Sequence, residues 1–524
     1  MTKLLNSKSY LIFFLLVIAV LFLRMGDINF TDGKYIWAED GSIFINQAFS
    51  LGLESIFEPY AGYIHLYPRL VSFLSVQIGL SFLPTIFFLG WIGAVIYSGF
   101  VVFKWLYNQT DSIAISMIVP LLALLQPHAG ETFFNITNAQ WFLALALIVL
   151  LIDKEYKASY KNFLIFILLG LTGPFSILVL PILFLNIVFK KDLKENYVKY
   201  LLVLVTAFIQ IYFMLKSNRV GGEVDPNILD WLKSVYIFFT FGTKGFFAVL
   251  SLFIWLILFI YVIKFFCDVC KKQFDNNQIN GLLIIIGLFI IYFAGLWSSK
   301  QFPLSLHPLG GGARYFVIPY ALLFISLPLL IKHIRVLYIV LFLIFIVDVK
   351  QFTKINRTSL NFQSFAWLSQ YTQNLIIPIH PQWGISYPEW HIAINNETNK
   401  NFYPINLNEV LIANGIRETE QIKSNNNDLQ LIFTLPTQCK NSHYIGLEVK
   451  IKRDLKGWSQ VFYTDSANGF SEEKSLKRFY SAGDIVMQFA FENNDFNSIR
   501  FDPTENVETL DIRSINVYCE KLVH

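Results

Sequence analysis

Apolar runs fill the first 350 residues of the chain and restrict what it can fold into. A helix needs roughly 20 apolar residues to cross the hydrocarbon core of a bilayer, and flanking Trp and Tyr can extend a shorter run into the interface. The pattern therefore predicts an α-helical polytopic membrane protein with about eleven transmembrane helices. The runs cover 10–23, 85–103, 113–126, 139–152, 162–175, 176–189, 199–215, 245–263, 281–297, 314–331 and 336–349.

The composition changes along the chain. Of the 524 residues, 55% are hydrophobic and 15% are charged, whereas a soluble protein has roughly 25% charged residues. We expect a transmembrane domain over 1–350, an interfacial linker over 351–383 and a β-sandwich domain over 384–524. The net charge of +4 comes without a basic run, so nothing indicates a nucleic-acid partner. Alternating apolar and polar residues predict the sandwich strands at 444–452, 458–463 and 484–491.

Lysine and arginine set the expected orientation. The N-terminal apolar run follows Lys3 and Lys8 and lacks a small-residue cleavage site, so it reads as an uncleaved signal anchor. The positive-inside rule then places the N-terminus in the cytoplasm and the tail outside. Basic and non-basic loops alternate between the two sides if the segment 68–83 is re-entrant or interfacial. If that segment crosses the membrane, one of the other short apolar runs does not cross it. The basic loops contain Lys104, Lys154, Lys157, Lys161, Lys190, Lys191, Lys194, Lys199, Lys264, Lys271, Lys272, Lys332 and Arg335.

Two adjacent acids, Glu39 and Asp40, lie in the first expected external loop. Acids close to a bilayer are costly to hold, so they are candidates for a function. Such a carboxylate could accept the proton of an attacking hydroxyl or hold a divalent cation. The alternative is a solvated acid or a cap for an amphipathic surface helix, which the apolar spacing predicts over 42–53.

An aromatic loop over 59–69 follows, with the sequence PYAGYIHLYPR. Arg69 could pair with a lipid headgroup or a substrate phosphate, or it could extend into the interface as many membrane arginines do. His65 lies between Tyr63 and Tyr67, where a structural hydrogen bond competes with substrate contact.

Two further loops carry polar groups. The loop over 127–141 is dense in hydrogen-bonding side chains and ends in a large aromatic, which suits a sugar, although capping and surface solvation are the alternative. Its candidate residues are His128, Glu131, Asn138, Gln140 and Trp141. In Gly310–Phe316, consecutive glycines let backbone amides approach an anion, and Arg314 would add charge-assisted bonds to phosphate. A flexible loop with an interfacial Arg is the alternative there.

The four cysteines give two expectations. Cys267 and Cys270 form a single C-x-x-C, which lacks the second pair that a structural zinc site needs, so two thiols are expected. Cys439 and Cys519 can form a disulfide if the tail is external, and otherwise remain reduced. We expect no metal site and no cofactor; a divalent cation near the acids is the less favoured option.

With these residues the chain resembles the GT-C class of membrane glycosyltransferases, and more narrowly the serotype-converting O-antigen glucosyltransferases of bacteria and phages. The tail is similar to β-sandwich modules of polysaccharide-related glycosyltransferases, which implies contact with glycan or packing against the membrane body. The resemblance rests on Glu39, Asp40, the 59–69 run, Glu131, 138–141, 313–315, and the tail segments 457–463, 469–473 and 499–503.

The resemblance implies an inverting hexosyltransferase in the bacterial inner membrane, with a periplasmic C-terminal domain. The donor would be a sugar, expected to be glucose, on undecaprenyl phosphate, and the acceptor O-antigen or another cell-surface glycan. Asp40, with Glu39, would deprotonate the acceptor, and Arg314, then Arg69, would hold the donor phosphate. Substrate-binding candidates are His65, Tyr63, His128, Glu131, Asn138, Gln140, Trp141 and Tyr315.

Other functions remain open. A lipid-linked sugar flippase or polysaccharide transporter would use the same arginines but would not need the first-loop acid. An O-antigen polymerase or ligase would rely on paired external arginines, and a purely binding role is a further alternative. A glycosyltransferase should bring Asp40 and Arg314 to one cavity at the external lipid boundary.

Overall fold

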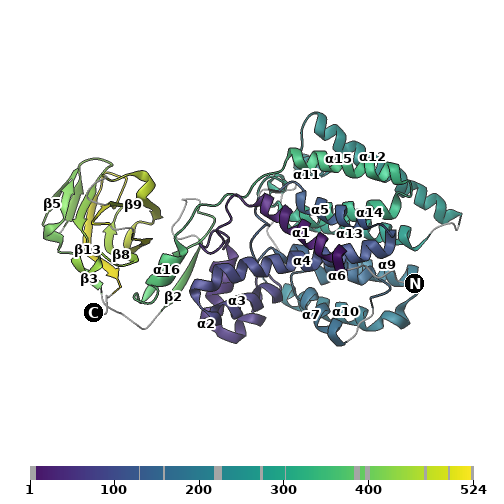
Figure 1. The fold of residues 1–524 in the computed structure, drawn as a ribbon, viewed down its shortest axis with the longest axis horizontal. Coiled ribbons are helices and arrows are strands. Elements are labelled where there is room, and N and C mark those ends of the chain that lie inside the picture. Colours follow the sequence, from purple (N-terminus) through teal and green to yellow (C-terminus); the bar gives the residue numbers. More distant parts are fainter. Residues whose placement is uncertain are drawn as a thin grey trace. The chain divides into compact units, whose positions relative to one another are not determined.

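The computed structural model describes residues 7–128, 130–156, 160–217, 227–271, 275–300, 302–382, 390–395, 402–419, 421–464, 469–493 and 496–520 (Figure 1). The chain forms two compact units. The first, here the helical unit, comprises Met1–Ile28, Leu53–Phe73 and Ile86–Arg357. The second, here the sandwich unit, comprises Asn29–Gly52, Leu74–Thr85 and Thr358–His524. Two short N-terminal segments thus belong with the C-terminal tail, which the expected boundaries at 350 and 384 did not anticipate.

Every predicted apolar run forms a helix (Figure 1). These helices are α1 (Ser7–Arg24), α4 (Leu83–Thr110), α5 (Ile113–Leu125), α6 (Ala139–Ile152), α7 (Tyr160–Gly170), α8 (Phe175–Leu178), α9 (Leu180–Lys190), α10 (Leu193–Lys216), α12 (Phe246–Cys270), α13 (Asn276–Ser298), α14 (Arg314–Leu330) and α15 (Ile334–Lys350). Further described helices include α3 (Leu66–Ile78), which covers most of the segment expected to be re-entrant, and α11 (Ile228–Phe239), which was not predicted.

Five described helices are long and apolar enough to cross a membrane. They are Ser7–Arg24, Leu80–Thr110, Leu193–Lys216, Phe246–Cys270 and Asn276–Ser298. Shorter apolar helices include α5, α6 and α14. The predicted helical fold is therefore confirmed in its coarser form, and the figure of about eleven crossing helices stays a prediction.

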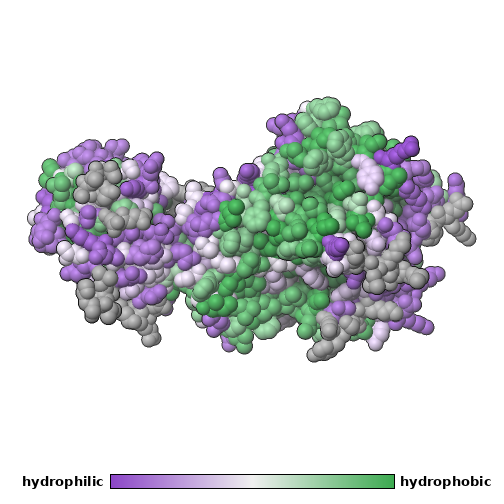
Figure 2. Space-filling model, viewed as in Figure 1, coloured by the Kyte–Doolittle hydropathy of each residue, from purple (hydrophilic) through white to green (hydrophobic). Residues whose placement is uncertain are grey.

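The helical unit has an apolar interior and an apolar exterior. All of α6 is buried, and α14 lies buried against α13. Helices of this kind, apolar on every side, belong to the core of a protein or to a membrane. The outer helices expose large apolar side chains, such as Phe208 on α10 at 69% and Leu215 at 81%. Figure 2 shows this apolar surface in green over the helices, and an apolar exterior of such extent suits lipid.

The connecting loops of the helical unit fall into two groups by their contacts. In the expected cytoplasmic group, the Lys199 ammonium donates to the Asp153 carbonyl at 2.6 Å, and Lys332 pairs with Asp275 at 3.1 Å. In the expected external group, Arg314 pairs with Glu131, and the Gly173 N–H donates to the Ile64 carbonyl at 3.1 Å. The sidedness of both groups of loops stays a prediction.

The predicted β-sandwich is present in the sandwich unit. One antiparallel sheet has the order β10-β9-β12-β7-β4; the other has the order β11-β8-β13-β6-β5, with β3 paired to β13. Apolar residues from both sheets share one core, among them Val461, Phe501, Leu447 and Val517. The strands are β3 (Phe402–Pro404), β4 (Leu411–Ala413), β5 (Gly415–Glu418), β6 (Gln421–Ser424), β7 (Gln430–Thr434), β8 (Tyr444–Arg453), β9 (Gly457–Thr464), β10 (Ser475–Tyr480), β11 (Gly483–Glu492), β12 (Ser498–Asp502) and β13 (Thr509–Cys519).

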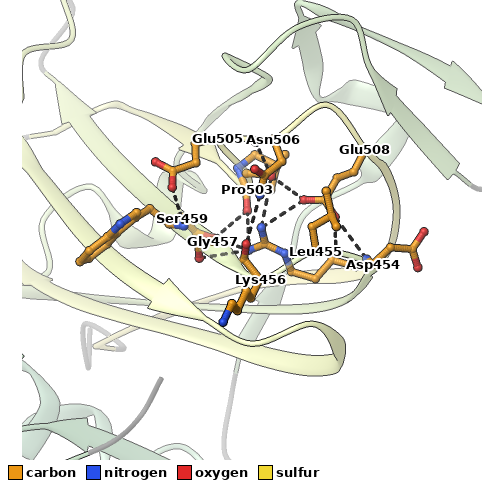
Figure 3. Close-up of polar contacts among 12 residues, drawn as sticks. Asp454, Leu455, Lys456, Gly457, Ser459, Pro503, Glu505, Asn506 and Glu508 are labelled. Carbon is orange, nitrogen blue, oxygen red and sulfur yellow. Dashed lines mark hydrogen bonds and ion pairs between the residues drawn. The ribbon is translucent and has the colours of Figure 1, made fainter. Parts of the chain in front are cut away.

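A buried ion pair holds one end of the sandwich (Figure 3). Arg453 ends β8, and its Nη2 lies 3.1 Å from Glu508 Oε1, with side chains 0% and 3% exposed. The other Glu508 oxygen accepts the backbone N–H groups of Asp454 and Leu455 at 3.2 and 3.0 Å. The pair ties the β8–β9 turn to the segment before β13.

The cysteine expectations are settled where the structure describes them. Cys439 and Cys519 form a disulfide that joins residues 80 apart and ties the end of β13 to the loop before β8. Cys267 and Cys270 are free and exposed at the end of α12.

A smaller layer completes the sandwich unit. Helix α16 (Phe362–Leu368) packs on β8 and β11, where a side chain at Gly446 would collide with Leu368. Strands β1 (Asn374–Pro378) and β2 (His391–Asn395) form a separate antiparallel pair. The expected linker over 351–383 therefore contains ordered α16 and β1.

Candidate functional site

The first-loop acids lie in an ordered helical segment. Residues Asp40–Ile45 form η1, a π-helical turn, and α2 (Asn46–Leu51) continues it, so the helix expected over 42–53 is present with mixed geometry. Asp40 is 0% exposed, and its Oδ2 accepts the Trp37 N–H at 3.1 Å. Glu39 is partly exposed. Asp40 is therefore not a solvated loop acid.

The C-terminal tail holds this segment within the sandwich unit. The Ser42 hydroxyl accepts the His391 N–H at 3.0 Å and lies 3.2 Å from the His391 carbonyl, to which it donates. The Asn46 side chain accepts the Ala393 N–H at 2.8 Å. These contacts dock η1 and α2 on β2, almost 350 residues away in sequence (a separation of 349 for Ser42 and His391). Sequence reasoning had no signal for this pairing, because neither partner belongs to a shared periodic pattern.

In the helical unit, an acid and a base meet at the start of α14. The Arg314 Nη1 donates to Glu131 Oε1, and the Gly312 N–H donates to Glu131 Oε2 at 3.1 Å. The side chain of Arg314 is 33% exposed and that of Glu131 is 16% exposed. Gly312 has a φ of +84°, which a side chain would strain. The result is an anion bound by one guanidinium and one backbone amide at a helix N-terminus, a location that favours negative charge.

Aromatic rings lie beside this ion pair. Trp141 and Tyr315 contact edge to face with centroids 5.4 Å apart, and the Arg314 guanidinium lies 5.4 Å from the Tyr315 ring centre. The Trp141 Nε1–H donates to Asn138 Oδ1 at 2.9 Å, and the Asn138 amide donates to the Glu131 carbonyl at 3.0 Å. Five predicted site residues are thus connected in one cluster: Glu131, Asn138, Trp141, Arg314 and Tyr315.

His128 and Gln140, two other predicted site residues, are both buried. His128 is 0% exposed and its Nδ1 accepts the Gly130 N–H at 2.6 Å. Burial, with the nearby charges of Arg24 and Arg357, holds the pKa of His128 well below its usual value. Gln140 is 5% exposed and lies against Gly173. Both side chains are buried, and their contact with a substrate stays a prediction.

Two supporting arginines were missed by the sequence reasoning. Arg24 is 0% exposed, and its Nε donates to the Leu124 carbonyl at 2.9 Å. Arg357 Nη2 donates to the Gly130 and Phe133 carbonyls at 2.9 and 3.2 Å. An arginine directly after the first apolar run was a usable signal for Arg24, since a charge there must either extend into the interface or find partners.

The aromatic loop is folded around His65. Tyr60 and Tyr63 exchange backbone hydrogen bonds at 3.0 and 3.2 Å, and their rings lie 5.8 and 4.7 Å from that of His65. His65 and Arg69 are each 1% exposed. Arg69 is therefore not the interfacial arginine considered above, and a phosphate could reach it only if the surrounding packing opened.

The predicted base and the predicted phosphate-binding arginine belong to different units. Asp40 belongs to the sandwich unit and Arg314 to the helical unit, so their convergence on one substrate stays a prediction. Within the described ranges, no group of three or more His, Cys, Asp or Glu could hold a metal ion.

Comparison with protein-family models gave no match, and comparison with curated proteins gave none either. Among solved structures, the chain is similar to one titled "BiXyn10A CBM1 APO", with 14% identity over 23% of this chain and 91% of that one, at a TM-score of 0.17. It is also similar to one titled "CBM4 structure and function", with 11% identity over 20% and 77% and a TM-score of 0.16. A third, the enzymatically active domain of tailspike protein 4 of bacteriophage CBA120, is 12% identical over 21% and 18%, with a TM-score of 0.16. Likenesses this weak carry no argument here.

Proposed function

We propose that the chain is an inverting glycosyltransferase that moves a hexose from a polyprenyl-phosphate donor to O-antigen or another cell-surface glycan. The reaction takes place at the periplasmic face of the bacterial inner membrane. The observation that carries the proposal is the cluster of Arg314, Gly312 and Glu131 beside Trp141 and Tyr315, at the N-terminal end of an apolar helix. Its polar and aromatic groups match a phosphate and a sugar respectively.

The phosphate argument rests on charge. A leaving polyprenyl phosphate gains negative charge in the transition state, and fixed donors aimed at that charge are the strongest electrostatic aid that a site can offer. Arg314 and the Gly312 N–H already bind one anion together, the Glu131 carboxylate. The apolar exterior of the helical unit suits the isoprenoid chain, which has to stay in lipid.

The sugar argument rests on the aromatic pair. Tyr315, which is partly exposed, offers its ring to the apolar face of a hexose, Trp141 packs edge to face against it, and Asn138 supplies an amide group for hydroxyls. Ligand sites commonly combine aromatic walls with a few placed polar groups. A hexose on a phosphate would fill both parts of such a cluster.

Asp40 is the proposed general base. It removes the proton of the acceptor hydroxyl as that oxygen attacks the anomeric carbon, and the lipid phosphate leaves from the opposite face. Asp40 is buried, so the acceptor hydroxyl reaches it only when the surrounding packing opens, and the Trp37 N–H fixes its orientation. Glu39, partly exposed beside it, is the second candidate.

Glycan analysis of cells that carry or lack the gene tests the proposal. We expect one added side-branch hexose on the surface polysaccharide in the presence of the gene, lost in the Arg314→Ala variant. A change in polymer length or attachment instead would indicate a polymerase or ligase. Unchanged glycan structure with altered export would indicate a transporter, and either result would reject the proposal.

A further inference from the structure

The Glu131 side chain takes up the donors that an anionic ligand would need. One carboxylate oxygen accepts from the Arg314 guanidinium, and the other accepts from the Gly312 N–H. A phosphate group, like a carboxylate, carries several oxygens on one atom. It could therefore accept from the same guanidinium and the same backbone amide. The same donors cannot fully satisfy both anions at once.

We propose that the Glu131 carboxylate occupies the place of the donor phosphate when the site is empty, and that the phosphate of an isoprenoid lipid displaces it on binding. This inference rests on the proposed function, since it names the group that must leave before the donor enters. It makes Glu131 a positioning residue that competes with the ligand, in place of the direct substrate contact expected from sequence.

The local structure allows this exchange without moving the loop. The backbone carbonyl of Glu131 accepts from the side-chain amides of Asn135 and Asn138, the latter at 3.0 Å. Arg357 holds the neighbouring Gly130 carbonyl at 2.9 Å. The main chain is therefore fixed by groups that do not involve the carboxylate. The Glu131 side chain, partly exposed at 16%, can rotate while its backbone stays in place.

The exposure of the Arg314–Glu131 ion pair sets how strongly Glu131 should weaken phosphate binding. Ion pairs that are partly open to water contribute about 0.2–1 kcal/mol, and about 1.4 kcal/mol corresponds to a tenfold change in affinity. Removing the Glu131 charge should therefore tighten phosphate binding by roughly 1.4- to fivefold. A residue that contacts the substrate would give the opposite sign.

The experiment measures binding of geranyl phosphate to the full chain in lipid nanodiscs by equilibrium dialysis. Glu131→Gln should bind it roughly 1.4- to fivefold more tightly than wild type, and Glu131→Asp, with its shorter side chain, should fall between them. Glu195→Gln removes the charge of an exposed acid at the start of α10 and should leave binding unchanged. Arg314→Ala should weaken binding at least tenfold, and the Glu131→Gln change should give no gain in that background.

The outcomes separate the inference from the proposed function. Equal or weaker binding by Glu131→Gln, together with the loss in Arg314→Ala, would overturn the competition and leave the donor site intact. Unchanged binding by Arg314→Ala would overturn both. Inorganic phosphate and geraniol distinguish the sources: a gain with free phosphate alone would exclude a lipid headgroup, and an equal gain with uncharged geraniol would exclude phosphate recognition.

Discussion

Replacing Asp40 by Asn removes the proposed base and keeps its shape. The side chain is 0% exposed, and its Oδ2 accepts the Trp37 N–H at 3.1 Å. The amide oxygen of Asn can accept the same bond, so the local fold should persist. The new NH₂ group has to find an acceptor, at a cost of about 1–3 kcal/mol in folding if it finds none.

The expected loss of activity is much larger than this structural cost. General-base catalysis contributes about 10²–10⁴ in rate, which is about 3–5 kcal/mol in the activation barrier. Asp40→Asn should therefore lower kcat for hexose transfer by that factor, with the KM for the donor nearly unchanged. In the proposed site the donor binds through Arg314, which this change does not alter.

Three variants in a transfer assay separate chemistry from folding. Ser42→Ala removes two of the hydrogen bonds that dock the same segment on β2, so it should lower stability while the folded fraction keeps its kcat. Glu39→Gln should cost less than about tenfold, because its charge is not the proposed base. If Asp40→Asn keeps more than a tenth of the wild-type kcat, or if Glu39→Gln shows the large loss instead, the assignment of Asp40 is wrong.

Three other predictions concern stability. Glu508→Gln leaves the buried Arg453 guanidinium without its counter-charge. This should lower the free energy of unfolding by about 3–5 kcal/mol and speed hydrogen exchange in β8 and β9. Unchanged exchange would contradict the prediction. Cys439→Ser opens a crosslink between residues 80 apart, and the loss of about 4–5 kcal/mol should lower the unfolding midpoint of the sandwich only under non-reducing conditions. Burial depresses the pKa of His128 in the folded state. The free energy of unfolding is therefore unaffected by His128 protonation above about pH 6.5. It falls as the pH drops below that value, because the unfolded chain then binds a proton that the folded chain does not. His128→Asn keeps an acceptor for Gly130 and should flatten that decline in an acid unfolding series.

Local patterns predicted much of the architecture. The apolar runs became helices because a backbone in an apolar surrounding must satisfy its own hydrogen bonds. The strands at β8, β9 and β11 followed from alternation, since successive side chains point to opposite faces. Helix α11 was missed because it is amphipathic: polar residues on one face interrupt the continuous apolar run that marks a membrane span.

The candidate site was only partly predictable. Residue types near expected loops identified Glu131 and Arg314, and the sequence could not show that they bind each other across 183 residues. The docking of the Asp40 segment on β2 is equally non-local. Burial decided the roles of His65 and His128, and burial depends on packing that no spacing rule describes.

Transfer from a defined donor tests the central claim most directly. The purified full chain in nanodiscs would receive an isotopically labelled hexose on undecaprenyl phosphate and a lipid-linked glycan acceptor, with the anomeric configuration of the product read by NMR. The account predicts one hexose added per acceptor branch with the configuration inverted relative to the donor, and free undecaprenyl phosphate released in equal amount. Retention of configuration, or movement of the intact donor across the bilayer without transfer, would contradict it.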